Sequence, residues 1–233
     1  MIRLLTGNNS YALTQRFESI KNEFKKQHGE SSYEQRGPDD IRIDELPQLF
    51  GGLSLFSTER LVVLRGVSAN RSVWDALVDH LEGVAVDVVL IEPSIDKRTR
   101  TYKWLQKHAV VETFDELDER ALLQWIQTYS MERGISIEPS VARFLVVHVG
   151  NDQWRLFHEI DKLSLSKKPI SSELIQDILD PNPQASAFEL LDAVLAGDKS
   201  RARQLLTSLK LAEDPYKFVG LLVSQLYALV ATV

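Results

Sequence analysis

The stretch Ile2-Arg3-Leu4-Leu5-Thr6-Gly7-Asn8-Asn9-Ser10 sets the fold class of this chain. A short, mostly apolar run is followed by one glycine and two asparagines, which is the pattern of a strand that ends in a tight turn. Ser10 is placed to cap a helix. Four apolar residues then recur at helical spacing, at Leu13, Phe17, Ile20 and Phe24. The chain is therefore predicted to begin with a strand, a turn and a helix that buries one face.

Three further apolar runs repeat the strand pattern. They are Leu61 to Leu64, Val86 to Ile91 and the weaker run Val110 to Phe114, and helical patterns separate them. Strands that alternate with helices form parallel sheets, because a parallel pair needs a long crossover connection. We predict an α/β domain in which helices cover a parallel sheet, with the layout of an ATPase.

After Asp115 the pattern becomes purely helical. Apolar residues at helical spacing predict helices from Leu117 to Arg133, Pro139 to Val149, Trp154 to Leu165 and Ser171 to Leu179. Pro181-Asn182-Pro183 marks a linker, and the chain beyond it is helical in pattern again. The predicted domains are residues 1–115, 116–181 and 182–233.

The composition is that of a folded globular protein without thiol chemistry. Hydrophobic residues make up 44% of the 233 residues and charged residues 26%, and there is no cysteine, which excludes disulfides, thiolate metal sites and cysteine nucleophiles. The run Ile2 to Leu5 is too short for a secretory signal. The apolar end from Phe218 to Val233 is too short and too interrupted by polar residues to span a membrane. We expect a cytoplasmic protein that does not contact membranes.

The charge argues against strong direct binding of nucleic acid. The net charge is −6 and the pI about 5.5, whereas proteins that bind DNA or RNA alone usually carry a basic surplus. A local exception lies on a predicted helix, where Arg98, Arg100, Lys103 and Lys107 form a basic cluster. This cluster is either a solvated helix face or a contact to an acidic partner surface or to nearby DNA.

The turn after the first strand stands where an ATPase carries its phosphate-binding loop. That loop needs the pattern G-x-x-x-x-G-K-[ST], whose backbone amides and lysine surround the phosphates. The turn from Gly7 to Ser10 has one glycine, no lysine and too few residues. Glu92 ends an apolar run as the magnesium-binding acid of ATPases does, but without a phosphate loop it has nothing to coordinate. We interpret it as an ordinary strand-end residue and expect no cofactor.

Other residues with catalytic or metal-binding potential form no recognisable site. No two of the five histidines have the spacing and the acidic partner of a metal-binding helix. No serine lies in a G-x-S-x-G nucleophile elbow. We therefore predict neither a catalytic nor a metal site.

The stretch Gly52-Leu53-Ser54-Leu55-Phe56-Ser57 carries two large apolar residues side by side after a glycine pair. In a helix, adjacent positions point about 100° apart, so one buried face does not easily take both side chains. Composition alone favours an arrangement in which one of them packs inward and the other covers the following strand.

Taken together, several segments resemble the delta subunit of the bacterial DNA polymerase III clamp loader, in order and spacing, over essentially the whole chain. These segments are Leu5 to Leu13, Leu53 to Leu64, Asp96-Lys97-Arg98 before Lys103, His158 to Leu163, and Ala187 to Ala193 with Gly197-Asp198. The resemblance implies an AAA+-related domain that has lost ATP binding, then a small helical domain and, from residue 182, the beginning of a helical collar domain.

The resemblance also implies a function. The chain would be a non-catalytic part of a DNA-directed DNA polymerase holoenzyme in the cytoplasmic, nucleoid-associated replisome. Its partners would be the sliding clamp (the beta subunit), whose open form it stabilises during DNA replication, and the other clamp-loader subunits, and it would contact DNA only indirectly. Leu53, Ser54, Leu55 and Phe56 would bind the clamp, with Leu55 and Phe56 inserted into a hydrophobic pocket. Peptides that enter this pocket tend to read Q-L-[SD]-L-F, and Gly52 stands where glutamine is usual.

One further departure from the family concerns the carboxyl end. The sequence stops at Val233 inside an apolar helical run, whereas family members carry a complete collar. An incomplete collar would favour poor assembly into a loader ring and self-association through exposed apolar side chains.

Two other classes of function stay open. One is a degenerate P-loop enzyme that binds nucleotides, against which the missing lysine argues. The other is a nucleic-acid-binding adaptor that uses the Arg98 to Lys107 cluster, against which the acidic pI argues.

Overall fold

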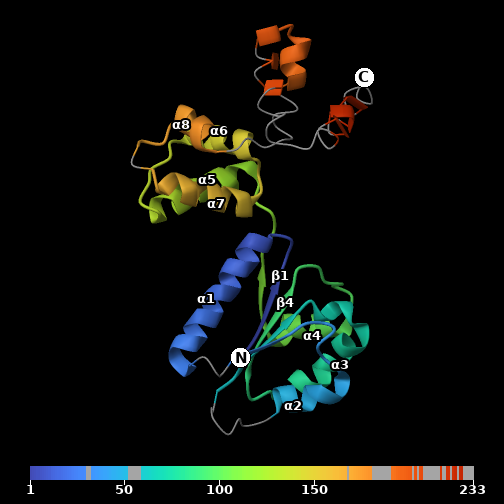
Figure 1. Cartoon of the computed structure of the whole chain (residues 1–233). Helices are drawn as coiled ribbons and strands as arrows, with labels where there is room; N and C mark the ends of the chain where they lie inside the picture. Colours follow the sequence, from blue (N-terminus) through green and yellow to red (C-terminus); the bar gives the residue numbers. More distant parts are fainter. Residues whose placement is uncertain are drawn as a thin grey trace. The chain divides into compact units, whose positions relative to one another are not determined.

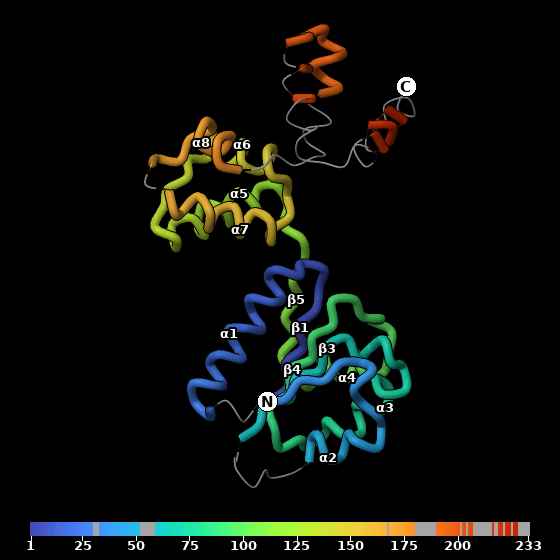
Figure 2. Tube along the Cα trace, in the orientation of Figure 1, coloured from blue at the N-terminus to red at the C-terminus, as the bar shows by residue number. Residues whose placement is uncertain are grey.

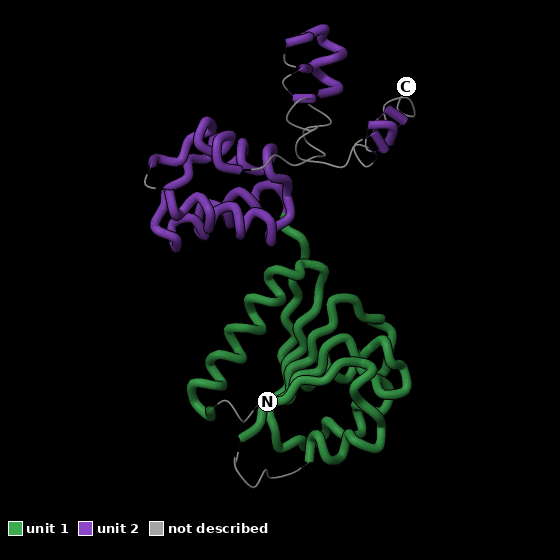
Figure 3. The backbone as a smooth tube through the Cα atoms, in the orientation of Figure 1, with its two compact units in different colours: residues 1–117 green, residues 118–233 purple. Residues whose placement is uncertain are grey.

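The computed structural model describes most of the chain, in two compact units. The described residues are 1–29, 33–51, 59–166, 168–179 and 190–200, with 202, 203, 205, 206, 216, 219, 220, 222–224, 226 and 227. The units are residues 1–117 and 118–233 (Figure 3). The predicted boundary at residues 181/182 lies outside the described residues, so the three-domain division stays a prediction.

The first unit is built on a parallel five-stranded sheet (Figure 1). Its strands are β1 (Ile2–Thr6), β2 (Tyr33–Arg36), β3 (Leu61–Arg65), β4 (Asp87–Glu92) and β5 (Val110–Thr113), in the spatial order β2-β3-β4-β1-β5. In this register Leu4 lies opposite Leu90 on one side and Val111 on the other. The four apolar runs predicted as strands are confirmed, and so is the parallel sheet.

Helices cover both faces of this sheet, as Figure 2 shows. One face packs against α1 (Ser10–His28); the other packs against α2 (Leu46–Phe50), α3 (Arg71–Leu81) and α4 (Arg100–His108). Because successive side chains of a strand point to opposite faces, β3 places Leu61 and Val63 on the α1 face and Val62 and Leu64 on the other. All four are buried, and each such side chain contributes about 1.5–3 kcal/mol.

Strand β2 is not predicted from the sequence, because Tyr33-Glu34-Gln35-Arg36 has no apolar alternation. It lies at the edge of the sheet and pairs only with β3. The Glu34 carboxylate accepts a hydrogen bond from Nη2 of Arg60 and lies 2.7 Å from Nη2 of Arg36. Pairing with β3 and these charged contacts hold a strand whose own side chains are mostly polar.

The first helix begins one residue earlier than its predicted cap implies. Asn9, rather than Ser10, is the N-cap, and its Oδ1 accepts a hydrogen bond from the Ala12 amide at 2.9 Å. Ser10 is the first helical residue. The prediction that Ser10 caps the helix is wrong, because Asn9 has the non-helical backbone of a cap and a side chain that reaches the third amide of the helix.

The second unit is helical over residues 118–179. Its helices are α5 (Glu119–Glu132), α6 (Pro139–Val149), α7 (Gln153–Ser164) and α8 (Ser172–Ile178), as the sequence pattern predicts. Asp118, Asp152 and Ser171 cap α5, α7 and α8. The core of this unit is formed by apolar side chains that all four helices contribute, among them Leu122, Ile126, Leu145, Leu156, Ile160 and Ile175.

Beyond α8, residues 190–195 are helical, and Leu190 and Ala193 are buried there. Within the described residues, no helix combines the length and the apolar character that crossing a bilayer requires.

Candidate partner-binding site

The turn between β1 and α1 is fastened to the segment that follows β5. The Asn9 amide donates to the Phe114 carbonyl at 3.0 Å, and Nδ2 of Asn9 donates to the Asp115 carbonyl at 3.2 Å. In the other direction, the Glu116 amide donates to Oδ1 of Asn8 at 3.2 Å. The two asparagines therefore tie the start of the chain to residues about a hundred positions away.

Gly7 makes this close approach possible. Its φ is +114°, in the region that favours glycine, and a Cβ atom at this position would lie 2.1 Å from the carbonyl oxygen of Phe114. No side chain fits there unless the backbone of the turn or of Phe114 moves. The glycine is required for packing of the turn against residue 114, rather than for approach of a phosphate.

The chemistry available at this turn follows from these contacts. A phosphate loop directs several free amides and a lysine toward the anion. Here the Asn9 amide is bound to Phe114 and the Ala12 amide to the side chain of Asn9. Residues 7–10 are all described, and none of them is cationic. This geometry supports the expectation that no nucleotide binds at the turn, which stays a prediction.

Glu92 has a more specific place than the sequence indicates. It lies beside Thr6 in the pairing of β1 with β4, and it is only 1% exposed. Its carboxylate accepts hydrogen bonds from the Ser68 amide, at 3.2 Å, and from the Ser68 hydroxyl. Burial raises the pKa of Glu92, and the hydrogen bonds from Ser68 oppose that rise. Glu92 is thus a buried anchor for the connection between β3 and α3, not an ordinary strand-end residue.

Of the four basic candidates, Arg100, Lys103 and Lys107 lie on α4 and Arg98 lies just before it, and all four are exposed. Nε of Arg98, just before the helix, lies 3.0 Å from Oδ1 of Asp96, and this bond lowers the pKa of Asp96 to about 2. Nη2 of Arg100 lies 2.8 Å from Oδ1 of Asp79. Within the part of the chain that the structure describes, Lys103 and Lys107 form no ion pair. Two of the four charges are therefore uncompensated locally.

The predicted clamp-binding residues Leu53, Ser54, Leu55 and Phe56 lie outside the described residues. The chain enters this segment from α2, whose last residue Phe50 is buried, and leaves it shortly before β3. Whether Leu55 and Phe56 are exposed stays a prediction.

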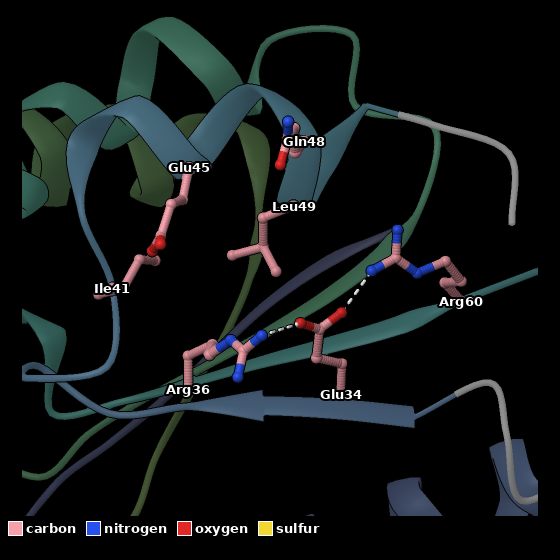
Figure 4. A pocket seen from close by; sticks show the side chains of 7 residues that line it. All are labelled: Glu34, Arg36, Ile41, Glu45, Gln48, Leu49 and Arg60. Atoms are coloured by element: carbon pink, nitrogen blue, oxygen red, sulfur yellow. Dashed lines mark hydrogen bonds and ion pairs between the residues drawn. The ribbon is translucent and has the colours of Figure 1, made fainter.

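A polar pocket of about 280 Å³ is lined by residues of β2, of α2 and of the segment before α2, and by Arg60 (Figure 4). Figure 4 shows the guanidinium groups of Arg36 and Arg60 directed toward the carboxylate of Glu34. The remaining lining residues are Ile41, Glu45, Gln48 and Leu49, from α2 and the segment before it. The lining carries two cations and two carboxylates, so its charge favours neither an acidic nor a basic ligand.

In the helical unit, the segment His158 to Leu163 holds α7 in place. Ile160 and Leu163 are fully buried, while Glu159 forms an ion pair with Lys162 at 2.7 Å. The family-like pattern E-x-x-K-L is thus accounted for by packing and by a pair one helical turn apart.

A hydrogen-bonded group also joins α5 to α7. The Tyr129 hydroxyl donates to Oδ1 of Asp161 at 2.8 Å and accepts from Nε of Arg133 at 2.8 Å. Burial and the bond to Asp161 raise the pKa of Tyr129 to about 12. Among the described residues, no three acidic or histidine side chains are grouped as a metal site requires.

Comparison with known proteins adds a fold assignment. No protein-family model matches this sequence, and no curated protein matches it. Among solved structures, the Bacillus subtilis DNA clamp loader delta protein superposes with a TM-score of 0.69 at 19% identity, over 96% of this chain and 71% of that one.

Two further solved structures are similar over the greater part of this chain. The replication initiator DnaA bound to AMPPCP and single-stranded DNA has a TM-score of 0.54 at 12% identity, over 83% of this chain and 61% of that one. The Thermotoga maritima RuvB Holliday junction branch migration motor has a TM-score of 0.50 at 10% identity, over 82% and 68%. As the resemblance implies, the chain has the ATPase-like α/β fold that this clamp loader delta protein, DnaA initiator and RuvB motor share.

Proposed function

We propose that this chain is a non-catalytic clamp-loader subunit that binds a DNA sliding clamp and stabilises its open form during DNA replication. The observation that carries the proposal is the similarity to a clamp loader delta protein over 96% of the chain. The first turn adds support, because a subunit whose turn is fastened to residues 114–116 would leave ATP binding and hydrolysis to its partners.

The clamp would be held by Leu53, Ser54, Leu55 and Phe56. Leu55 and Phe56 are adjacent large apolar residues in a pattern that matches clamp-binding peptides except at Gly52. Insertion of both side chains into an apolar pocket would contribute about 3–6 kcal/mol. A cluster of this kind usually dominates an interface of ordinary size.

Opening of the clamp needs no chemistry by this subunit. A partner that binds the open ring more tightly than the closed ring raises the open population by the ratio of the two affinities. A hundredfold preference for the open ring corresponds to a difference of about 2.7 kcal/mol between the two binding free energies. In this role the chain would act with the other clamp-loader subunits at the cytoplasmic replisome and would contact DNA only through the clamp.

The decisive experiment measures clamp affinity for the Leu55→Ala, Phe56→Ala double variant. We expect a loss of a few hundredfold or more, corresponding to about 3–6 kcal/mol, with little change in melting temperature. The matched control is Met131→Ala with Leu165→Ala, because these apolar side chains are 64% and 83% exposed in the helical unit. The control variant should keep wild-type affinity.

Ring opening is measured separately, with a fluorophore pair placed across one clamp interface. The wild-type chain should increase the distance between the fluorophores and the double variant should not. Unchanged clamp affinity in a folded double variant would refute the proposed site. A chain that does not bind the clamp at all would refute the proposed function.

A further inference from the structure

The exposed face of α4 combines cationic and aromatic side chains. At about 100° per residue, Arg100, Lys103, Trp104 and Lys107 fall within one arc of this helix, and His108 lies at its border. The opposite arc is buried and contains Thr101, Tyr102 and Leu105. The helix therefore packs on the sheet with one side, and its other side is exposed.

This face has a positive surplus in a chain of net charge −6. Its cations, with their neighbours, are Arg71, Lys97, Arg98, Arg100, Lys103 and Lys107. The acids paired with them are Asp75, Asp79 and Asp96. Lys103 and Lys107 have no acidic partner among the described residues, so the surplus is centred on the middle of α4. Such a surplus attracts polyanions.

The aromatic part of the face has a defined geometry. The rings of Trp104 and His108 are stacked, with centroids 4.4 Å apart and planes 17° from parallel. Nδ1 of His108 donates to the Trp104 carbonyl oxygen at 2.9 Å, which fixes the orientation of the imidazole. Trp104 packs partly on the core, whereas His108 is exposed. The outer face of the imidazole thus continues a stack that the core supports.

We propose that this face of α4 binds single-stranded nucleic acid, with phosphates on Lys103 and Lys107 and an unstacked base on the outer face of His108. Aromatic platforms beside cationic side chains are the usual means of holding a single strand, because every base has a flat face that stacks. In a duplex the base faces are already stacked on one another, so no base is free to stack on the imidazole of His108. An acidic protein surface would use the lysines but not the ring. This contact goes beyond the proposed function, in which DNA is reached only through the clamp.

The first test measures binding of the full chain to a labelled oligothymidylate by fluorescence anisotropy over a range of salt concentrations. The Lys103→Gln, Lys107→Gln variant should lose about eightfold in affinity for each contact at 0.05 M salt, and its slope of log affinity against log salt should be about 1.4 smaller. The charge-matched control is Lys25→Gln with Lys26→Gln on α1, which covers the other face of the sheet. Equal losses in both variants would overturn the proposed site.

The second test isolates stacking. His108→Ala should lower affinity for oligothymidylate about tenfold and leave affinity for an abasic oligomer of equal length unchanged. His108 is exposed, so the fold is expected to survive, and circular dichroism checks this. Equal binding of a duplex, or of polyglutamate matched in charge, would show a general polyanion site and overturn the proposal. An equal effect of His108→Ala on the abasic oligomer would overturn the stacking platform.

Discussion

Gly7→Ala is expected to destabilise the α/β unit far more than an alanine at an ordinary left-handed glycine. The φ of +114° already disfavours alanine, at a cost of about 1–3 kcal/mol. The new Cβ would also lie 2.1 Å from the carbonyl oxygen and 2.5 Å from the carbonyl carbon of Phe114. Both neighbours are backbone atoms, so the turn and the end of β5 have to move apart.

That movement breaks the hydrogen bonds that fasten the turn. The Asn9 amide loses its hydrogen bond to the Phe114 carbonyl, and the Glu116 amide loses its hydrogen bond to the side chain of Asn8. Each loss costs about 0.5–1.5 kcal/mol, so the total destabilisation, with the backbone strain, is roughly 2–6 kcal/mol. Gly83→Ala is the matched control. Gly83 has a φ of +74°, but no atom lies within 4 Å of the place that a Cβ would take, so only strain of about 1 kcal/mol remains.

Urea unfolding followed by tryptophan fluorescence measures the difference. A background of Trp125→Phe with Trp154→Phe leaves Trp74 and Trp104 as reporters, both of which belong to the α/β unit. We expect Gly7→Ala to lower the free energy of unfolding by at least about 1 kcal/mol more than Gly83→Ala does. If the two variants are equally stable, the turn is not held against residue 114 and the reasoning about the closed turn is wrong.

Three further outcomes follow from the described contacts. Calorimetry with ATP and magnesium should give no binding, and a micromolar Kd would contradict the account of the first turn. The pKa of Glu92 is raised in the folded chain, so the folded state holds the proton of Glu92 to higher pH than the unfolded state does. The free energy of unfolding of the wild type, relative to that of Glu92→Gln, should therefore fall as pH rises from the ordinary glutamate pKa of 4.5 through the higher folded pKa. Urea unfolding between pH 4 and 8 should detect this trend. A difference that grows in the opposite direction would contradict the burial of that carboxylate. Tyr129→Phe keeps the ring but removes the hydroxyl that lies between Asp161 and Arg133. It should destabilise the helical unit by about 1–2 kcal/mol, measured in a thermal melt followed by circular dichroism. An unchanged melting temperature would count against this hydrogen-bonded network.

The sequence predicts the elements that carry an apolar run or a regular apolar stripe. Strands β1, β3 and β4 lie inside the sheet, the edge strand β5 keeps a short apolar run, and helices α5 to α8 bury one regular stripe, so both periodicities are visible. Strand β2 is an edge strand of four mostly polar residues. Its stability comes from pairing with β3 and from Arg60, which no local pattern reveals.

Some features of the candidate sites are visible in the local sequence, whereas others depend on residues that are distant in the sequence. The shortness of the first turn is local and is visible directly, but its attachment to residues 114–116 depends on the neighbouring position of β1 and β5. The hydrogen bonds to the buried Glu92 carboxylate come from Ser68, which lies in the connection between β3 and α3, 24 positions away in the sequence. One missed signal was local: Trp104 and His108 are four residues apart, and on a helix such as α4 that spacing brings side chains together.

The acidic net charge and the basic face of α4 together imply a binding mode that neither implies alone. A chain of net charge −6 is repelled by a polyanion over most of its surface, so its own affinity for a single strand is low at physiological salt. A local surplus still orients the approach, because near contact the uncompensated Lys103 and Lys107 dominate the field. If the chain is held on a clamp that encloses DNA, the strand is present at an effective concentration on the order of millimolar, and a weak site becomes occupied. The low intrinsic affinity would then confine contact with nucleic acid to the assembled complex, and Lys103→Gln with Lys107→Gln would weaken DNA retention there without altering clamp affinity.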